Sequence, residues 1–588
     1  MIQKEFEVLR AMALKPNMTQ RDYSEFLGVS LGTVNKRLKS LDEAGLIAQN
    51  SITDSGWKEL ERHKVDNAIV MAAGMGTRLA PLTFEKPKGL FKVRGEVLIE
   101  RHLRQLKDAG IDDIYLVVGY LKEQFLYLEE EYGVHILVND DYWRWNNIST
   151  LRVARSHLKN SYICSSDDWM EVNPYSRWEW KPFYSAVKMD GKTDEYVIKA
   201  KRNGDIDAVL TNGGKDCWCM YGSVYFTNEF SQSFLSLIDR EWESRRTKGM
   251  LWEDLYSEHV SELPSMQIKR VYDGLYEFDS LEDLRKFDPL YVDNIDSSIL
   301  SNICNVFNIK QSQIFKMAPV KEGLTNNSFS FFTNDGQWIY RSPGRGTSQY
   351  INRINEAKAV DIAVSLKLDR TVVHMDPAEG WKISRFKPNV RQLDYHNEAD
   401  IDEAIRMMHV LHDAKMKVDW TFGTWDSSED FYQKLVEGRS NLPLDLELMH
   451  ARMKKVAFCW KSDNVEPILC HCDCYAPNFL IGDDGMDLID WEYSGMDDPA
   501  CDLGTFICCS DMTDEEIEQV ISKYYGNDIS PTIARHQSAS TAISAWYWYV
   551  WALWQESIGK STGEWLYLWW KMSNEWMAKA LKEYGKEA

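Results

Sequence analysis

Hydrophobic and polar positions follow three different patterns along the chain, and the changes fall near residues 64 and 295. Residues 1–64 show short helical periods. Residues 65–295 alternate apolar runs with amphipathic stretches, the pattern of a mostly parallel sheet covered by helices. Residues 296–588 begin with two strands and are then mainly helical. We therefore predict three domains with these bounds, in a multidomain protein of α/β and α+β classes.

The first domain follows the helix-turn-helix plan. Residues 19–27 predict one helix, and residues 31–41, capped by Ser30, predict a second. A small wing over residues 46–53 and a closing helix from Thr53 would follow. The second helix is expected to point three bases outward: Lys36, Arg37 and Lys39. The pattern resembles winged-helix domains of bacterial regulators. It allows DNA binding, but the acidic body behind it favours a docking or dimerisation role, such as a homodimer.

A glycine-rich loop follows the first buried strand of the second domain, at residues 68–73. Its glycines allow backbone N–H groups to approach triphosphate oxygens. Arg78 provides a fork that suits a leaving pyrophosphate, and Lys88 a point charge for the acceptor's phosphate. Residues 96–109 predict the next helix, and residues 114–118 the next strand. The loop contacts that we expect with the nucleotide are Ala72, Ala73, Gly74, Gly76 and Thr77.

These residues, with Pro87-Lys88, resemble the nucleoside-diphosphate-sugar pyrophosphorylase superfamily, and within it the CTP:phosphocholine cytidylyltransferases. Stretches 117–120, 146–151 and 162–167 extend the resemblance over residues 66–288. It implies a Rossmann-like domain that binds Mg²⁺ through Asp167 and Asp279, although Asp168 could replace Asp167. The other contacts that we expect here are Gly119, Asn147 and Ser149 with the nucleotide, and Trp169 with the substrate.

The third domain contains His471-x-Asp473-x-x-x-x-Asn478, with Asp490 twelve residues further on. This is the spacing of a kinase catalytic loop and its metal-binding Asp. We expect Asp473 to accept the proton of the substrate hydroxyl, and Asn478 and Asp490 to hold Mg²⁺ against the phosphates of ATP. Upstream, Asn334-Asp335-Gly336 predicts a hairpin between strands at 328–333 and 338–342.

The same residues resemble the choline/ethanolamine kinase and aminoglycoside phosphotransferase group, which implies a protein-kinase-like, two-lobed fold over residues 300–588. The resemblance places Arg341 at the cation of the third strand and Glu356 at its helical partner. It also places four residues in the nucleotide loop: Gly323, Thr325, Asn326 and Asn327.

An aromatic run at residues 546–554 has helical spacing, with Tyr547, Trp551 and Trp554 on one face. Aromatic boxes bind quaternary ammonium groups by cation–π attraction, but such a stripe could equally be core. We expect Glu492, Trp551 and Trp554 to contact the substrate.

Composition narrows the class of protein. Lys and Arg number 68 and Asp and Glu 90, a net charge of −22, which argues against a surface that binds nucleic acid or anionic lipid throughout. The start has no secretory pattern, and the longest apolar run, at residues 541–554, is short for a membrane span. The 11 Cys suit reduced thiols. We predict a cytoplasmic protein with no membrane insertion.

A kinase makes a phosphate monoester, and a nucleotidyltransferase consumes one. The two resemblances together imply that choline and ATP give phosphocholine, and that phosphocholine and CTP give CDP-choline and pyrophosphate, for decoration of cell-surface polymers. Ethanolamine, aminoethylphosphonate or a sugar phosphate could take the place of choline in the same chemistry. A transcriptional regulator that senses nucleotides is the alternative of another class.

Overall fold

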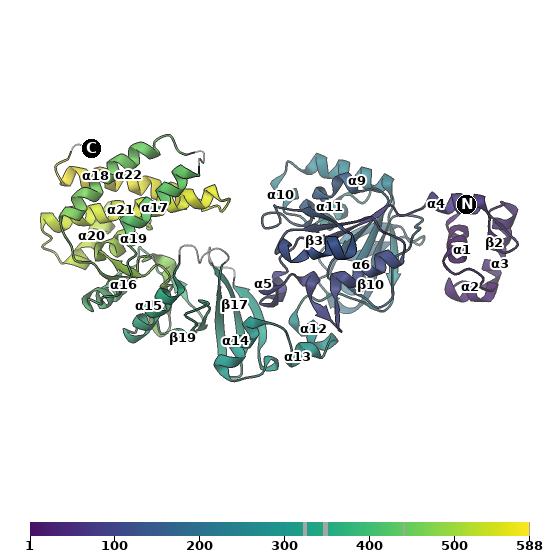
Figure 1. Ribbon diagram of the computed structural model, residues 1–588, viewed down its shortest axis with the longest axis horizontal. Helices are drawn as coiled ribbons and strands as arrows, with labels where there is room; N and C mark the ends of the chain where they lie inside the picture. Colours follow the sequence, from purple (N-terminus) through teal and green to yellow (C-terminus); the bar gives the residue numbers. More distant parts are fainter. Residues whose placement is uncertain (321–325, 345–350, 439–441, 587–588) are drawn as a thin grey trace. The chain divides into compact units, whose positions relative to one another are not determined.

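The computed structural model describes residues 1–320, 326–344, 351–438 and 442–586 (Figure 1). The chain divides into two compact units, residues 1–312 and 313–588. The first unit contains a small helical domain and a domain built on a large sheet, and the second has a kinase-like architecture. The predicted fold classes are confirmed. The domain bounds at residues 64 and 295 stay predictions.

Residues 3–61 form a winged helix-turn-helix. Ser30 caps the second helix of the motif as predicted, because the Thr33 N–H donates to its Oγ at 3.2 Å. One expectation is wrong: Arg37 does not point outward. Its side chain is only 20% exposed and lies 3.6 Å from Glu5. The elements are α1 Gln3–Leu14, α2 Gln20–Phe26, α3 Leu31–Glu43, β1 Ile47–Ala48, β2 Ser51–Ile52 and α4 Asp54–Glu61.

Helix α1 packs against residues 178–180 of the following domain. Phe6 and His63 contact the ring of Trp180, with centroids 5.4 and 4.5 Å away. Between them and the sheet lies Glu179, which accepts hydrogen bonds from Arg10 at 3.0 Å and from the Tyr162 hydroxyl at 2.7 Å. A half-buried cation and a buried acid thus connect the winged helix domain to a strand of the sheet.

The central strands of the nine-stranded sheet are parallel, in the order β8-β3-β6-β7. Alternate residues face opposite ways: Ala68 and Val70 pack under α6, whereas Ile69 packs with α8, α9 and α11. An antiparallel extension, β12-β11-β13 with β10, continues the sheet beyond β8, and β14 pairs with β10 in parallel. The strands are β3 Asn67–Ala72, β6 Ile114–Val118, β7 His135–Val138, β8 Ser161–Ser165, β10 Phe183–Thr193, β11 Val197–Ala200, β12 Ile206–Leu210, β13 Gly214–Phe226 and β14 Gln267–Val271.

Helices cover both faces of this sheet (Figure 1). They are α5 Leu82–Glu85, α6 Leu98–Asp108, α7 Tyr127–Tyr132, α8 Asn147–Val153, α9 Asn228–Glu241, α10 Arg245–Lys248 and α11 Trp252–His259. After the sheet come α12 Leu281–Phe287, α13 Leu290–Asp293 and α14 Ser298–Phe307. Two short ribbons accompany the sheet, β4 Lys92–Val93 with β5 Glu96–Val97, and β9 Trp169–Met170 with β15 Leu275–Tyr276.

The second unit begins with an antiparallel sheet in the order β16-β17-β18-β20-β19 and helix α15. The predicted hairpin is confirmed as β17 and β18. These elements are β16 Phe315–Val320, β17 Asn326–Thr333, β18 Gly336–Pro343, α15 Arg353–Ser365, β19 Val372–Met375 and β20 Lys382–Arg385.

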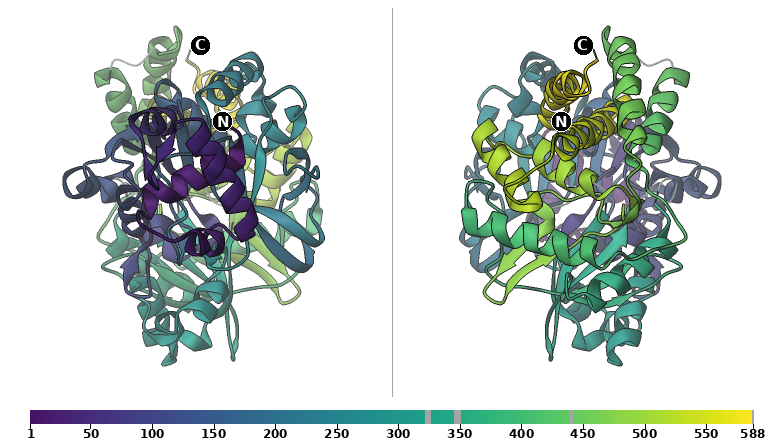
Figure 2. Two further views of the ribbon diagram at one scale, coloured as in Figure 1. Left: turned by 90° about the vertical axis from the view of Figure 1, so that its right-hand side faces the viewer. Right: turned by 90° about the vertical axis from the view of Figure 1, so that its left-hand side faces the viewer.

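A mainly helical part follows, and its long helices α21 and α22 run side by side (Figure 2, right). Its helices are α16 Glu398–Asp413, α17 Thr424–Glu437, α18 Leu446–Ser462, α19 Pro499–Cys508, α20 Asp514–Tyr525, α21 Pro531–Ser557 and α22 Trp565–Glu583. Its strands are β21 Arg391–Gln392, β22 Ile468–Cys470, β23 Phe479–Gly482, β24 Gly485–Leu488 and β25 Gly495–Asp497. Among the helices of the described residues, none is both long and apolar enough to cross a bilayer.

The docking of α1 predicts the effect of Arg10→Ala. The substitution leaves the buried Glu179 without its main cation, so we expect the free energy of unfolding of the first unit to fall by roughly 3 kcal/mol. Arg62→Ala is the matched control, because Arg62 also pairs with a glutamate but is 76% exposed. The control should change stability by about 0.5 kcal/mol or less. Urea unfolding of the full chain measures the stability of both variants. Equal losses of stability would contradict a stabilising role for the Arg10–Glu179 pair.

Candidate active sites

The first candidate site lies at the carboxyl end of β3. Ala72 and Ala73 are buried at the end of the strand, and the chain then turns through Gly74 to Gly76 into a short helical turn that starts at Thr77. Gly76 has a φ of +59°, and a Cβ there would lie 3.0 Å from Thr83. The position therefore favours glycine for both conformation and space.

Three carboxylates surround the ammonium of Lys88. Its Nζ lies 2.5 Å from Asp167, 3.8 Å from Glu277 and 3.9 Å from Asp279. Burial alone would lower the pKa of Lys88, but the carboxylates outweigh it and the pKa is raised. Arg78 joins the cluster through Asp279, at 3.0 Å. The sequence therefore anticipated four of the five members, and the structure adds Glu277.

The arrangement distinguishes Asp167 from Asp168. Asp167 contacts Lys88, whereas the Asp168 carboxylate is buried and one of its oxygens has no hydrogen-bond partner among the described residues. Asp167 and Asp279 direct oxygens toward one cationic nitrogen, and an oxygen-only donor set suits Mg²⁺. These two residues fit the metal better than a pair that includes Asp168.

Other residues expected at the nucleotide make contacts within the fold. The Asn147 amide donates to Glu253 at 3.1 Å and accepts from the Trp252 N–H at 2.7 Å. Ser149 is buried and accepts from Asn139. A Cβ on Gly119 would lie 2.8 Å from Tyr142, so this glycine allows a close approach. These side chains hold α8 and α11 in place rather than point into open space.

Trp169, expected to contact the substrate, is buried between other side chains. The Arg101 guanidinium lies 4.4 Å from its ring centroid, and Phe287 packs edge-on at 5.8 Å. The ring belongs to the packing between β9 and the helices beside it.

The second candidate site is the loop after β22. The Asn478 amide donates to Asp473 Oδ2 at 2.9 Å and to the Asp473 carbonyl at 2.8 Å, which fixes the carboxylate in the loop. Burial, reinforced by the carboxylate of Asp490, raises the pKa of Asp473 well above its usual range. Asp502 fixes the backbone of the loop, because its carboxylate accepts hydrogen bonds from the backbone N–H groups of His471 at 2.9 Å and Cys472 at 2.6 Å.

Arg341 on β18 connects this loop to helix α15. Its guanidinium contacts Glu356, lies 2.9 Å from Asp490 and 3.8 Å from Glu492. Burial would lower the pKa of Arg341, but the three carboxylates outweigh burial and raise it. The sequence prediction of an Arg341–Glu356 pair agrees with this geometry. Asp490 and Asn478 supply oxygen atoms at the same cavity, which suits Mg²⁺.

The catalytic loop opens into a cavity of about 520 Å³. Asp473, Asn478, Asp490 and Arg341 line it. A wall of aromatic rings, here called the aromatic wall, forms another side: Tyr475, Tyr493, Trp548, Trp551, Trp565 and Trp569. The rings touch one another, with Trp548 stacked on Trp569 at 5.6 Å and Trp565 on Trp569 at 5.2 Å. Tyr475 joins the wall to the catalytic loop through Trp565, at 6.2 Å.

Of the residues expected to contact the substrate or the nucleotide in this domain, some line the cavity and others do not. Trp551 lies in the aromatic wall, but Trp554 packs on Phe431 at 5.2 Å and does not line the cavity. Glu492 lines the cavity with its carboxylate 3.4 Å from Arg353. Asn327 is exposed on β17. Gly323 and Thr325 lie outside the described residues, as does the side chain of Asn326.

Sequence reasoning missed Trp565 and Trp569. They lie on α22, four residues apart and therefore on one helix face, which is a signal that could have indicated them. What the sequence did not reveal is that α22 packs beside α21.

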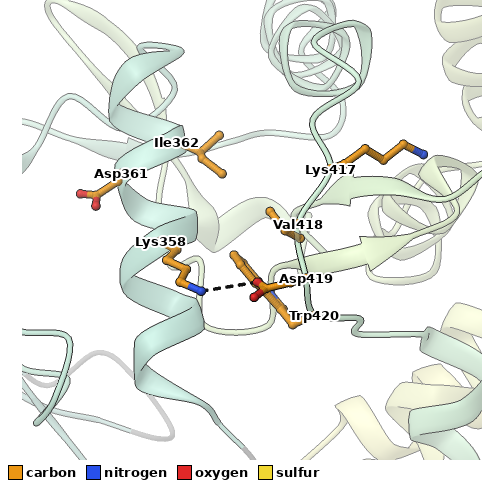
Figure 3. A pocket seen from close by; sticks show the side chains of 7 residues that line it. All are labelled: Lys358, Asp361, Ile362, Lys417, Val418, Asp419 and Trp420. Atoms are coloured by element: carbon orange, nitrogen blue, oxygen red, sulfur yellow. Dashed lines mark hydrogen bonds and ion pairs between the residues drawn. The ribbon is translucent and has the colours of Figure 1, made fainter.

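A separate hollow lies between α15 and residues 417–420 (Figure 3). Its charges are paired locally, with Lys358 Nζ 3.4 Å from Asp419 and 5.2 Å from the Trp420 ring centroid. The residues that line it belong to neither motif, so this hollow is not a second catalytic site.

The geometry thus defines two enzymes of different class in one chain, a nucleotidyltransferase and a phosphotransferase of the kinase type. Family models agree: a winged helix-turn-helix DNA-binding model matches residues 3–48, a MobA-like NTP transferase domain residues 68–167, and the phosphotransferase enzyme family residues 372–536.

Two characterised relatives match the middle of the chain. A choline-phosphate cytidylyltransferase of Streptococcus pneumoniae is 31% identical over 223 residues, 38% of this chain and 97% of the relative. A 2-aminoethylphosphonate cytidylyltransferase of Lancefieldella rimae is 34% identical over 232 residues, 38% of this chain and 93% of the relative. The chain belongs to this family of cytidylyltransferases. The crystal structure of the choline kinase LicA from Streptococcus pneumoniae is 21% identical, with a TM-score of 0.43, and covers 48% of this chain and 98% of its own.

The geometry of the second site predicts the effect of Asp473→Asn. The amide cannot accept a proton, so phosphate transfer from ATP should fall about a thousandfold. Pyrophosphate release by the other site, assayed with its phosphorylated acceptor supplied, should stay unchanged, because Asp473 belongs to the separate unit 313–588. Parallel assays of ADP and pyrophosphate formation measure the two rates. Loss of both together would contradict the assignment of one reaction to each unit.

Proposed function

We propose that the protein phosphorylates choline with ATP and then transfers CMP from CTP to the resulting phosphocholine, giving CDP-choline and pyrophosphate. ATP and CTP, the two nucleotide substrates, suit a cytoplasmic protein, and so does the reduced state of the 11 free cysteines. The product suits the decoration of cell-surface polymers. Binding of DNA and formation of a homodimer stay predictions.

The aromatic wall is the observation that carries the choice of substrate. A quaternary ammonium cannot donate a hydrogen bond, and proteins bind it on aromatic faces, where cation–π attraction is strong because water is excluded. Trp548, Trp551 and Trp569 are nearly fully buried and share one cavity with Asp473. A cation against these rings would place a hydroxyl two carbons away within the cavity that holds the catalytic loop.

The first reaction needs few groups. The oxygen of choline forms a bond to the γ-phosphorus of ATP, the bond to the β-bridging oxygen breaks, and ADP leaves. Asp473, held by Asn478, accepts the hydroxyl proton. Asp490 and Asn478 would hold Mg²⁺, which would neutralise phosphate charge during the transfer. Arg341 keeps Asp490 in position.

The second reaction joins two anions, so cations dominate it. An oxygen of phosphocholine forms a bond to the α-phosphorus of CTP, and pyrophosphate leaves from the other side. Lys88 and Arg78 reduce the repulsion between acceptor and triphosphate, while the loop of Gly74 to Gly76 offers backbone N–H groups to the phosphates. Asp167 and Asp279 would hold Mg²⁺, which would stabilise charge on the α-phosphate.

One relative acts on 2-aminoethylphosphonate, so this acceptor is the main alternative for the middle domain. A phosphonate has a carbon–phosphorus bond, which a hydroxyl kinase does not make. The kinase site in the same chain therefore favours a phosphate ester as the acceptor. Ethanolamine would be a poorer fit for six aromatic rings, since its ammonium donates hydrogen bonds. A pure regulator is disfavoured by two complete sets of catalytic residues.

Lys88→Ala tests the second reaction. Removal of the cation leaves three carboxylates facing the acceptor, so we expect CMP transfer to supplied phosphocholine to fall about 100-fold to 1,000-fold. Choline phosphorylation in the same sample should keep its rate. Lys92→Ala is the control, because Lys92 is an exposed lysine four residues away. An unchanged rate of CMP transfer would remove Lys88 from the site.

Trp551→Leu tests the choice of choline. Loss of a ring from the aromatic wall should raise the KM for choline about tenfold to thirtyfold, the equivalent of 1.4–2 kcal/mol of cation–π attraction, and leave the KM for ATP unchanged. Trp554→Leu is the matched control on the same helix, since Trp554 packs on Phe431 outside the cavity. Steady-state kinetics with both substrates measure the difference. Equal effects of the two variants would argue against a choline site at the wall.

A further inference from the structure

Lys382, the first residue of β20, faces the kinase cavity from the sheet. The strand register places it in one row with three other cavity residues. Ser328 pairs with Val320 on one side and with Arg341 on the other, and Arg341 pairs in turn with Lys382. Because paired residues on neighbouring strands point to the same face of a sheet, the row presents two neighbouring cations to the same space.

The two cations have different surroundings. Arg341 has three carboxylates around it, with Glu356, Asp490 and Glu492 all within 4 Å. Lys382 is only 7% exposed, yet within the described part of the chain it has no ion pair. The other lysine of the cavity, Lys387, contacts Asp484 and Asp487. Among the described residues, Lys382 is therefore the buried lysine of this cavity without a carboxylate partner.

An uncompensated buried ammonium costs several kcal/mol unless a ligand neutralises it. The cavity also holds Asp473 and Asn478, so a ligand there is expected to carry the phosphates of a nucleotide. Arg341 is already shared among three carboxylates, so a second cation beside it would add to the attraction of the cavity for phosphates.

We propose that Lys382 binds the phosphates of ATP in the kinase site, beside Arg341, which also contacts Glu356, Asp490 and Glu492. This inference rests on the proposed kinase function and adds a phosphate-binding residue that the motifs did not indicate. Lys382 is then a second cation of the site that contacts the nucleotide.

Binding of ADP and of adenosine to the full-length protein, measured by calorimetry without any amino-alcohol, tests the assignment. Lys382→Met should weaken ADP binding at least tenfold and change adenosine binding less than twofold, because adenosine lacks phosphates. Lys382→Arg should restore most of the affinity for ADP. Lys455→Met, on the exposed face of α18, is the control and should leave both affinities unchanged. If Lys382→Met does not fold, Lys382→Gln replaces it with the same expectations.

The outcomes separate this inference from the proposed function. If the unaltered protein binds no ADP, the proposed kinase function itself is overturned. If it binds ADP and the Lys382 variant binds ADP equally well, or loses ADP and adenosine to the same extent, the role of Lys382 in phosphate binding is overturned.

Discussion

One central cation in each catalytic unit contacts three carboxylates that would otherwise repel one another, and a second cation, Arg78 or Arg353, contacts part of the same cluster. Lys88 gathers Asp167, Glu277 and Asp279, and Arg341 gathers Glu356, Asp490 and Glu492. Clustered carboxylates out of water are unfavourable for two reasons, desolvation and mutual repulsion. The central cation offsets both, so the acids that these reactions need are already in position before a nucleotide binds.

The two clusters balance their charge differently. In the first, Asp167 is ionised, because the effect of Lys88 on its pKa outweighs that of burial, and the pKa is lowered. Burial and the charge of Asp167 raise the pKa of Glu277 to about 7, so this third acid carries a proton part of the time near neutral pH. In the second, an arginine replaces the lysine, and its planar fork contacts several acids at once. The difference suits a cation that must move toward an acceptor in one site and one that stays in place in the other.

The catalytic loops could be predicted from the sequence because their chemistry depends on residues close together in the chain. Gly74 to Lys88 and His471 to Asn478 are short segments whose spacing fixes their geometry. The winged helix could also be predicted from the sequence, since Ser30 and Thr53 cap its helices by local hydrogen bonds. The antiparallel extension of the sheet and the inward turn of Arg37 were not, because each depends on partners far away in the sequence.

The same reasoning applies to side chains at the sites whose surroundings the sequence did not indicate. A helical wheel of α21 groups Trp551 with Trp554, yet only the neighbouring helices decide which ring faces a cavity. Asn147 and Ser149 lie beside a nucleotide motif, but tertiary hydrogen bonds to Glu253 and Asn139 occupy their side chains. The burial of Lys382 without a carboxylate could not be seen from composition, because it follows from the register of β18 and β20.

The aromatic wall takes two of its rings from α22, which ends at Glu583. During synthesis on the ribosome, the motif around Asp473 emerges about a hundred residues earlier. The two α22 rings of the aromatic wall therefore leave the ribosome after every residue of the catalytic loop, so the cavity gains these two rings only when nearly the whole unit has been made.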